Sequence, residues 1–384
     1  MRRRAAVPVF LLFWLVAIAS FAHAQSKPRA RDLGVPFDGA PGLLNAITDV
    51  AGVEIGHTTI IAGEGELKIG QGPIRTGVTA VLARGRAGSA PVFAAFFSLN
   101  GNGEMTGTHW VEESGLLEGP VMITNTHSVG AVHEAAIAWN VRRGGGQQPW
   151  SLPVVAETWD GALNDINGFH VREKHVFEAL ENARGGAVAE GNVGGGTGMI
   201  CHEFKGGIGT ASRKLEERAG GYSVGVLVQC NYGLRRQLRI AGIPVGAEIP
   251  VQSPRASDEE GSIIIVVATD APLLPHQLKR LARRAALGLA RNGSVAGNSS
   301  GDIFIAFSTA NSAAGTSTGL ADLKMLPNDR IGPLFEATVQ ATEEAIVNAL
   351  VAAETMTGVN NRRVVALPHD RLREVLRKYN RLKN

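Results

Sequence analysis

The sequence predicts a single domain of the α/β (α+β) class, in which sheets and helices pack in layers. The apolar run Ile263–Thr269 has the composition of a buried strand, and a helix with one apolar face is expected from Pro275. The segment Tyr222–Asn231 alternates strictly between two sets of side chains, as a strand does. No repeat or linker divides the sequence, so one layered domain accounts for it.

The composition is that of a globular protein with a sizeable core. Of 384 residues, 44% are hydrophobic and 19% are charged, and the net charge is +3. Much of the basic excess lies in Arg2–Arg4 and in the tail after Arg371, while aromatic residues make up only 5%. A nucleic-acid-binding surface combines a basic stripe with aromatic side chains, so no nucleic-acid partner is expected.

The first 24 residues have the pattern of a secretory signal peptide. Arg2–Arg4 form a positively charged N-terminal region, and Val7–Phe21 form an apolar core. Ala22-His23-Ala24 has the small residues of a signal-peptide cleavage site. The apolar run is shorter than the ~20 residues that a membrane-spanning helix needs. We expect a periplasmic or secreted mature chain from about Gln25, without membrane association after signal removal, and we interpret residues 25–40 as a tether.

Strands and helices are expected along the rest of the chain from their residue patterns. Strands are indicated by short β-branched or apolar runs, at 46–58 (with a turn), 77–83, 90–96, 121–125, 154–160 and 303–308. Helices are indicated by apolar residues three or four apart, at 129–139, 175–183, from Pro333 to near Gly358, and at 370–379.

The glycine-rich segment Gly191–Gly198 resembles a phosphate-binding loop, but no Gly-Lys-Ser or Gly-Lys-Thr follows it. We therefore expect its glycines to line a cleft or to let two backbones touch. The histidines form no His-Glu-x-x-His, and no Cys-x-x-Cys occurs, so neither a metal ion nor another cofactor is expected. Cys201 and Cys230 could pair in an oxidising compartment, but the buried strand around Cys230 favours free thiols.

Ser262 stands where an acidic segment beginning at Asp258 enters the predicted buried strand. Gly261 has no Cβ, so a hydroxyl can approach its carbonyl and its backbone can adopt unusual dihedrals. Attack by Ser262 on that carbonyl would form an ester, and hydrolysis would then cut the chain. The new N-terminal serine would carry a nucleophile beside an amine of pKa about 8, which can act as a general base.

The Gly-Ser pair has a simpler interpretation, and the chain has one competing cleavage position. Taken alone, a Gly-Ser pair is also compatible with an ordinary turn before a strand. The bond between Asn298 and Ser299 is a second position at which the chain could cut itself. We rank it lower, because only Ser262 begins a buried strand and has Ser300 and Asp302 downstream as partners.

Five segments in the same order resemble a known family: Glu157–Gly161, Val226–Gly233, Gly261–Ile264, Ala268–Pro272 and Ser299–Asp302. The family comprises the self-processing serine aminopeptidases (peptidase family S58), which include D-aminopeptidase/esterase and the β-peptidyl aminopeptidases. The resemblance covers nearly the whole mature chain. It implies a four-layer αββα sandwich resembling N-terminal-nucleophile hydrolases, self-cleavage into residues 25–261 and 262–384, and assembly as a tetramer of these αβ units.

The resemblance also implies an activity and a role for each matching residue. The enzyme would release β-amino acids or small α-amino acids from peptides, amides and esters with a free N-terminal amine, through an acyl-enzyme. Ser262 would be the nucleophile, with its own amine as base, and Ser300 and Asp302 would shuttle and anchor protons beside it. Asn231 would donate to the oxyanion, and Glu157 would bind the amine of the substrate.

The chemistry of these residue types agrees with the roles. A hydroxyl can relay a proton, and a carboxylate two residues on points the same way along a strand. An amide at a strand end suits an oxyanion, although Asn231 could instead cap a turn and Glu157 could be a solvated charge. Trp159 is expected at the substrate site, where some members have tyrosine; an indole donates a hydrogen bond but cannot relay a proton. Asp302 stands where some β-peptidyl members have glutamate.

Two other kinds of protein fit parts of the sequence. Ornithine/glutamate acetyltransferases also cut themselves, but they use an N-terminal threonine and work in the cytoplasm, whereas this sequence has a serine and an export signal. A periplasmic solute-binding protein would have two α/β lobes, an intact chain and no dependence on Ser262.

Overall fold

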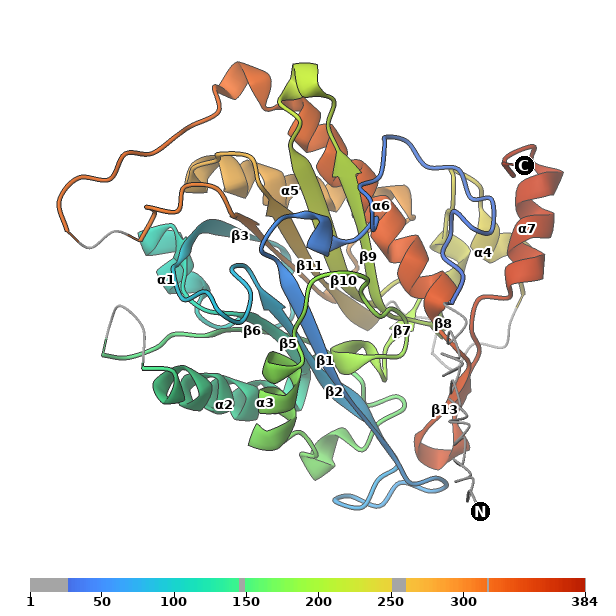
Figure 1. The fold of residues 1–384 in the computed structure, drawn as a ribbon. Coiled ribbons are helices and arrows are strands. Elements are labelled where there is room, and N and C mark those ends of the chain that lie inside the picture. The colour runs from blue at the N-terminus through green and yellow to red at the C-terminus, as the bar shows by residue number, and fades with distance from the viewer. Residues whose placement is uncertain (1–26, 145–148, 251–259, 316–317, 384) are drawn as a thin grey trace, which may run out of the picture.

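The computed structural model describes residues 27–144, 149–250, 260–315 and 318–383 (Figure 1). The predicted signal peptide and the acidic residues Asp258 and Glu259 therefore lie outside the described residues. Within the described part of the chain, no helix is both long enough and apolar enough to cross a membrane.

Two sheets carry the fold. The smaller has the strand order β1-β2-β5-β6, with bounds Glu54–Ala62, Ile74–Leu82, Val121–Asn125 and Val154–Thr158. The larger has the order β4-β3-β12-β11-β10-β9, with bounds Leu116–Leu117, Val92–Gly101, Ser299–Ser308, Glu260–Thr269, Ser223–Asn231 and Gly207–Lys214. The central pair β11 and β12 is parallel, and β10 pairs with β11 antiparallel.

Helices cover the outer face of each sheet, which produces four layers (Figure 1). The helices α2 (Val129–Arg142) and α3 (Glu173–Glu181) pack on the smaller sheet. The helices α5 (Pro275–Arg291) and α6 (Gly332–Ala352) pack on the larger one. A separate apolar core lies between the two sheets. The predicted αββα sandwich is confirmed.

Short elements complete the chain. They are α1 (Thr108–Ser114), the hairpin β7 (Ile200–Cys201) and β8 (Phe204–Lys205), α4 (Val245–Glu248), the hairpin β13 (Met356–Thr357) and β14 (Arg363–Val364), and α7 (His369–Lys378). The hairpin of β7 and β8 lies against the end of β10, which brings it close to the predicted site.

The strand β11 shows why its sequence is apolar without interruption. Ile263, Ile265 and Val267 face the core under α5 and α6, whereas Ile264 and Val266 face the core between the sheets. Both faces of this strand are therefore removed from water, as is usual for a parallel central strand.

Several expectations about the elements need correction. The α6 helix ends at Ala352 rather than near Gly358, because Ala353 has an extended backbone. The strand β12 begins at Ser299, four residues before the expected start at Ile303. The strand β9 was not predicted from the sequence, because Gly207–Lys214 is rich in small residues and lacks an apolar alternation. The prediction for Gly191–Gly198 is confirmed: a Cβ on Gly196 would lie 2.5 Å from the backbone nitrogen of Ile208.

The cysteines also need correction, because Cys201 and Cys230 form a disulfide rather than free thiols. Their Cα atoms lie 5.6 Å apart, since β7 lies beside the end of β10. A sequence pattern places Cys230 in a buried strand but contains no sign of this neighbour, which only the tertiary structure supplies.

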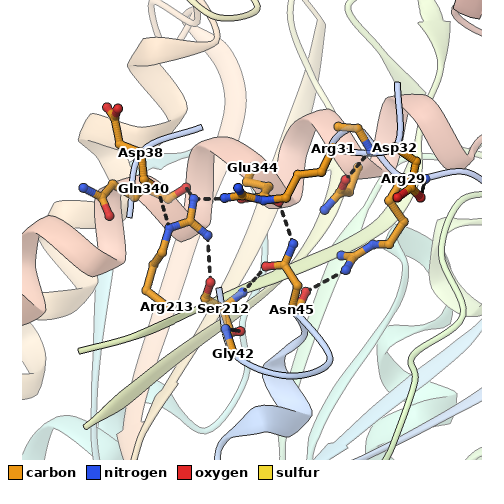
Figure 2. A network of polar contacts seen from close by, with 12 residues as sticks. Arg29, Arg31, Asp32, Asp38, Gly42, Asn45, Ser212, Arg213, Gln340 and Glu344 are labelled. Atoms are coloured by element: carbon orange, nitrogen blue, oxygen red, sulfur yellow. Dashed lines mark hydrogen bonds and ion pairs between the residues drawn. The ribbon is translucent and has the colours of Figure 1, made fainter. Parts of the chain in front are cut away.

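Residues 25–40 are not a loose tether where the structure describes them. Arg31 makes a bidentate contact with Glu344 of α6, and both N···O distances are 2.7 Å. Both residues belong to the polar network drawn in Figure 2. Arg213 of β9 pairs with the same carboxylate at 2.8 Å. Burial alone would raise the pKa of Glu344, but Arg31 and Arg213 hold it below its usual value. The N-terminal segment is thus anchored on α6 through a buried carboxylate.

Candidate active site

Ser262 is the third residue of β11, and it opens onto a cleft between the two sheets. Its hydroxyl oxygen accepts a hydrogen bond of 3.1 Å from the backbone N–H of Gly301 on β12. The residue is only 6% exposed, so one side of the hydroxyl faces packed backbone while the other meets the cleft. The hydroxyl is therefore fixed by a hydrogen bond on one side and can be reached from the cleft on the other, as a nucleophile requires.

Gly261 occupies a position that no other residue tolerates. Its φ is +152°, and a Cβ there would lie 2.1 Å from the carbonyl oxygen of Asn231 and 2.9 Å from the Cα of Tyr232. A side chain would force β10 away from β11 at the junction. The backbone just before Ser262 therefore depends on glycine.

Asn231 ends β10 directly opposite Ser262 in the antiparallel register. Side chains at opposed positions share a face of the sheet, so the amide and the hydroxyl point to the same side. Asn231 Oδ1 accepts from the backbone N–H of Ile200 at 2.8 Å, and Nδ2 donates to the carbonyl of Trp159 at 2.9 Å. These two bonds set the direction of the side-chain amide.

Glu157 reaches the cleft from β6 of the facing sheet and is 3% exposed. One carboxylate oxygen accepts from the backbone N–H of Glu104 at 2.9 Å, and the other accepts from the hydroxyl of Thr126. Burial raises the pKa of Glu157, while these two hydrogen bonds oppose the rise. A buried carboxylate at a cleft wall is suited to bind a cation.

Ser300 and Asp302 form a buried hydrogen-bonded pair on β12, with Ser300 Oγ donating to Asp302 Oδ1 at 2.7 Å. They stand beside Gly261 and Ile263 in the parallel register, on the strand next to Ser262. Because alternate side chains point to opposite faces, the pair faces the helix layer, as Ile263 does, and not the cleft. It thus flanks the backbone of Ser262 rather than its hydroxyl.

The cleft joins most of the predicted site. A cavity of about 430 Å³ is lined by Ser262, Gly261, Glu157, Trp159 and Ser299, together with Asn102, Gly103, Glu104 and Thr126. Trp159 is 40% exposed, and its indole forms part of the wall. Another cavity, walled by three tryptophans (Trp110, Trp139 and Trp150), lies beyond the start of β6 and contains none of the predicted residues.

The two residues that hold Glu157 were not predicted from the sequence. Thr126 follows β5, which is parallel to β6, so the ends of these strands meet at one edge of the sheet. Glu104 belongs to a glycine-rich stretch that crosses to β12, where Asn102 Nδ2 donates to the carbonyl of Ser299. No local pattern in the sequence pointed to either residue, because both contacts depend on how the strands pair in the folded chain.

The described residues contain no group of three or more His, Cys, Asp or Glu side chains placed to hold a metal ion.

Comparison with known proteins identifies the family. The profile of peptidase family S58 matches residues 45–364, which is most of the chain. This chain belongs to that family. It is accordingly a peptidase, and the family predicted from the five segments is confirmed.

Individual relatives are similar over nearly their whole length. The chain is 55% identical to the β-peptidyl aminopeptidase BapA of Sphingosinicella microcystinivorans over 382 residues, covering 95% of this chain and 96% of the relative. The structure of a Burkholderia sp. β-aminopeptidase matches with a TM-score of 0.85 and 52% identity, over 91% of this chain and 99% of that one.

A third similar protein is the L-aminopeptidase D-Ala-esterase/amidase of Ochrobactrum anthropi, described as a prototype for the serine aminopeptidases and a variant of the Ntn hydrolase fold. Its structure matches with a TM-score of 0.87 and 51% identity, over 93% of this chain and all of that one. The predicted Ntn-like architecture is confirmed, and neither a transferase nor a solute-binding protein is favoured.

Proposed function

We propose that the chain is a self-processing aminopeptidase that uses Ser262 as its nucleophile. It releases β-amino acids or small α-amino acids from the amine end of peptides, amides and esters. One observation carries this proposal: the hydroxyl of Ser262 and the buried carboxylate of Glu157 line the same cleft from facing sheets. The names of the relatives, which include β-peptidyl aminopeptidases, support the substrate class.

The substrate step follows from these positions. Glu157 binds the ammonium group of the substrate, which sets the first residue against Ser262 and explains why a free amine is required. The hydroxyl attacks the carbonyl carbon, and its proton passes to the amine of Ser262. Asn231 donates to the resulting oxyanion. The leaving amine takes up the proton, and water hydrolyses the acyl-enzyme.

The same hydroxyl first frees its own amine. Ser262 Oγ attacks the carbonyl carbon of Gly261, and the C–N bond breaks as the hydroxyl proton passes to the departing nitrogen. Water then hydrolyses the ester, which leaves a carboxyl on Gly261, restores the hydroxyl of Ser262 and gives residues 25–261 and 262–384. The glycine at position 261 supports this step, because a residue without a Cβ leaves its carbonyl open to a hydroxyl, and a side chain would not fit beside the carbonyl oxygen of Asn231. Ser300 and Asp302, which flank the backbone of Ser262, then orient the new amine and exchange protons with it.

We further propose that the enzyme is exported by its N-terminal signal peptide and works in the periplasm or outside the cell, as a tetramer of αβ units. It requires no cofactor and binds neither nucleic acid nor membrane after signal removal. The disulfide between Cys201 and Cys230 supports this compartment, because such bonds persist in oxidising surroundings.

Denaturing electrophoresis and N-terminal sequencing of the purified protein test the proposal. The second fragment should begin Ser-Ile-Ile-Ile, which cleavage before Ser299 would not produce. A Ser262→Ala variant should remain whole and release no amino acid from β-alanyl or α-alanyl amides. A single uncut band with full peptidase activity would refute both the self-cleavage and the role of Ser262.

A further inference from the structure

Lys205 is fully buried beside the proposed site, at the end of the β7–β8 hairpin. Its ammonium group donates to the carbonyl oxygens of Met199 and Gly206, both at 2.8 Å, and to that of Gly196 at 3.4 Å. Three backbone carbonyls match the three N–H groups of an ammonium. Removing an ammonium group from water costs free energy. Lys205, which only backbone carbonyls hold in the described structure, is therefore expected to have a specific role.

The carbonyl of Met199 belongs to the same peptide group as the N–H of Ile200. That N–H donates to Asn231 Oδ1 at 2.8 Å, and Asn231 Nδ2 in turn donates to Trp159 O at 2.9 Å. A continuous chain of hydrogen bonds thus runs from Lys205 through one peptide group to the side-chain amide opposite Ser262.

We propose that Lys205 is a positioning residue that polarises the Met199–Ile200 peptide and so strengthens Asn231 as the oxyanion donor. Donation to a carbonyl oxygen draws electrons from the peptide nitrogen and makes its N–H a better donor. The same effect at Asn231 Oδ1 makes the Nδ2 hydrogens more acidic. The inference rests on the proposed function, in which Asn231 stabilises the oxyanion.

The surroundings of Lys205 support this role. Burial is the main cause that lowers the pKa of Lys205 well below its usual value. The amine of Lys205 has three N–H donors when it is protonated and two when it is neutral. Either form can therefore keep the hydrogen bond to the carbonyl oxygen of Met199. The disulfide Cys201–Cys230 ties the same hairpin to β10 and limits how far the peptide can move. Lys205 is fully buried and donates to three backbone carbonyls, so it acts through Asn231 and not by touching the substrate.

A double-mutant cycle tests the proposal with Lys205→Met, Asn231→Ala and the double variant. Removing an oxyanion donor costs about a hundred- to a thousandfold in kcat, and one polarising bond contributes about 10–30% of a donor's strength, so Lys205→Met should lower kcat roughly two- to eightfold. The KM for a β-alanyl amide should change less than about twofold, because Glu157 holds the substrate. The double variant should be no slower than Asn231→Ala alone.

The outcomes separate the inference from the proposed function. Full kcat in Asn231→Ala would remove the donor role of Asn231 itself, whatever Lys205 does. Two other outcomes would overturn only the role of Lys205. In the first, Asn231→Ala lowers kcat but Lys205→Met does not. In the second, the effects of the two single substitutions on kcat multiply in the double variant.

Two further variants guard against a purely structural effect. Lys205→Gln keeps two N–H donors one bond shorter, and it should recover part of the lost kcat; failure of both Lys205 variants to fold and process would also overturn the proposal. The matched control is Arg213→Met, which removes another buried cation that donates to backbone carbonyls far from Asn231. Arg213→Met should lower the melting temperature without changing kcat.

Discussion

Replacement of Glu157 by glutamine gives the sharpest test of how the enzyme recognises its substrate. Glutamine has the same shape, its oxygen can still accept from the backbone N–H of Glu104, and the hydroxyl of Thr126 can rotate to accept from its amide. The variant should retain the fold and lose only the negative charge that, in the proposed function, faces the ammonium group of the substrate. A hydrogen bond between charged groups contributes about 1.5–3 kcal/mol, so kcat/KM should fall roughly 10- to 150-fold.

The assay compares a free and an N-acetylated β-alanyl amide with both enzymes. The wild type should strongly prefer the free amine, and the Glu157→Gln variant should lose most of that preference. The control is Glu181→Gln, because the Glu181 side chain is exposed at the end of α3, on the outer side of the smaller sheet, and is not part of the cleft lining. An exposed charge is screened by solvent, so this variant should change kcat/KM little. Unchanged selectivity in Glu157→Gln would refute the role of Glu157.

The pKa of Glu157 adds two checks of the same reasoning. Burial raises this pKa above the ordinary value of 4.5, so the carboxylate is lost as the pH falls through a point above that value, and kcat/KM should decline there. The raised pKa also means that ionised Glu157 destabilises the folded state above its unfolded pKa. Glu157→Gln should therefore melt at or above the wild-type temperature at neutral pH, and a clearly lower melting temperature would contradict this.

Three further predictions concern the stability of the fold. In Gly261→Ala the new methyl would lie 2.1 Å from the carbonyl oxygen of Asn231, so the variant should melt lower and stay uncut; normal processing would show that glycine is not needed. Glu344→Gln should lose about 3–5 kcal/mol in urea unfolding because it leaves Arg213 buried without a counter-charge. In the wild type this stabilisation should disappear as the pH falls through the lowered pKa of Glu344, and a flat acid profile would contradict it. Cys201→Ser opens a disulfide between residues 29 apart in sequence and should cost about 3–4 kcal/mol; equal stability with and without reductant in the wild type would count against the bond.

The sequence by itself determined the central elements and the chemistry of the junction. An apolar run can be stable as a strand only when both of its faces are buried, so Ile263–Thr269 could be assigned to the core without coordinates. Gly261 and Ser262 stand next to each other in the chain, and the chemistry of that bond depends on adjacency alone. The spacing of Ser300 and Asp302 likewise predicted that they share a face of one strand, and they are hydrogen-bonded there.

Tertiary structure alone decided which distant residues meet. Glu157 belongs to the other sheet, and its partners Glu104 and Thr126 depend on how strands pair at an edge, which no local pattern encodes. The same holds for the bond between Cys201 and Cys230 and for the contact of Lys205 with the peptide that orients Asn231. Side-chain periodicity reports which face of an element is buried, but it does not report what that face is buried against, and the site is built from such contacts.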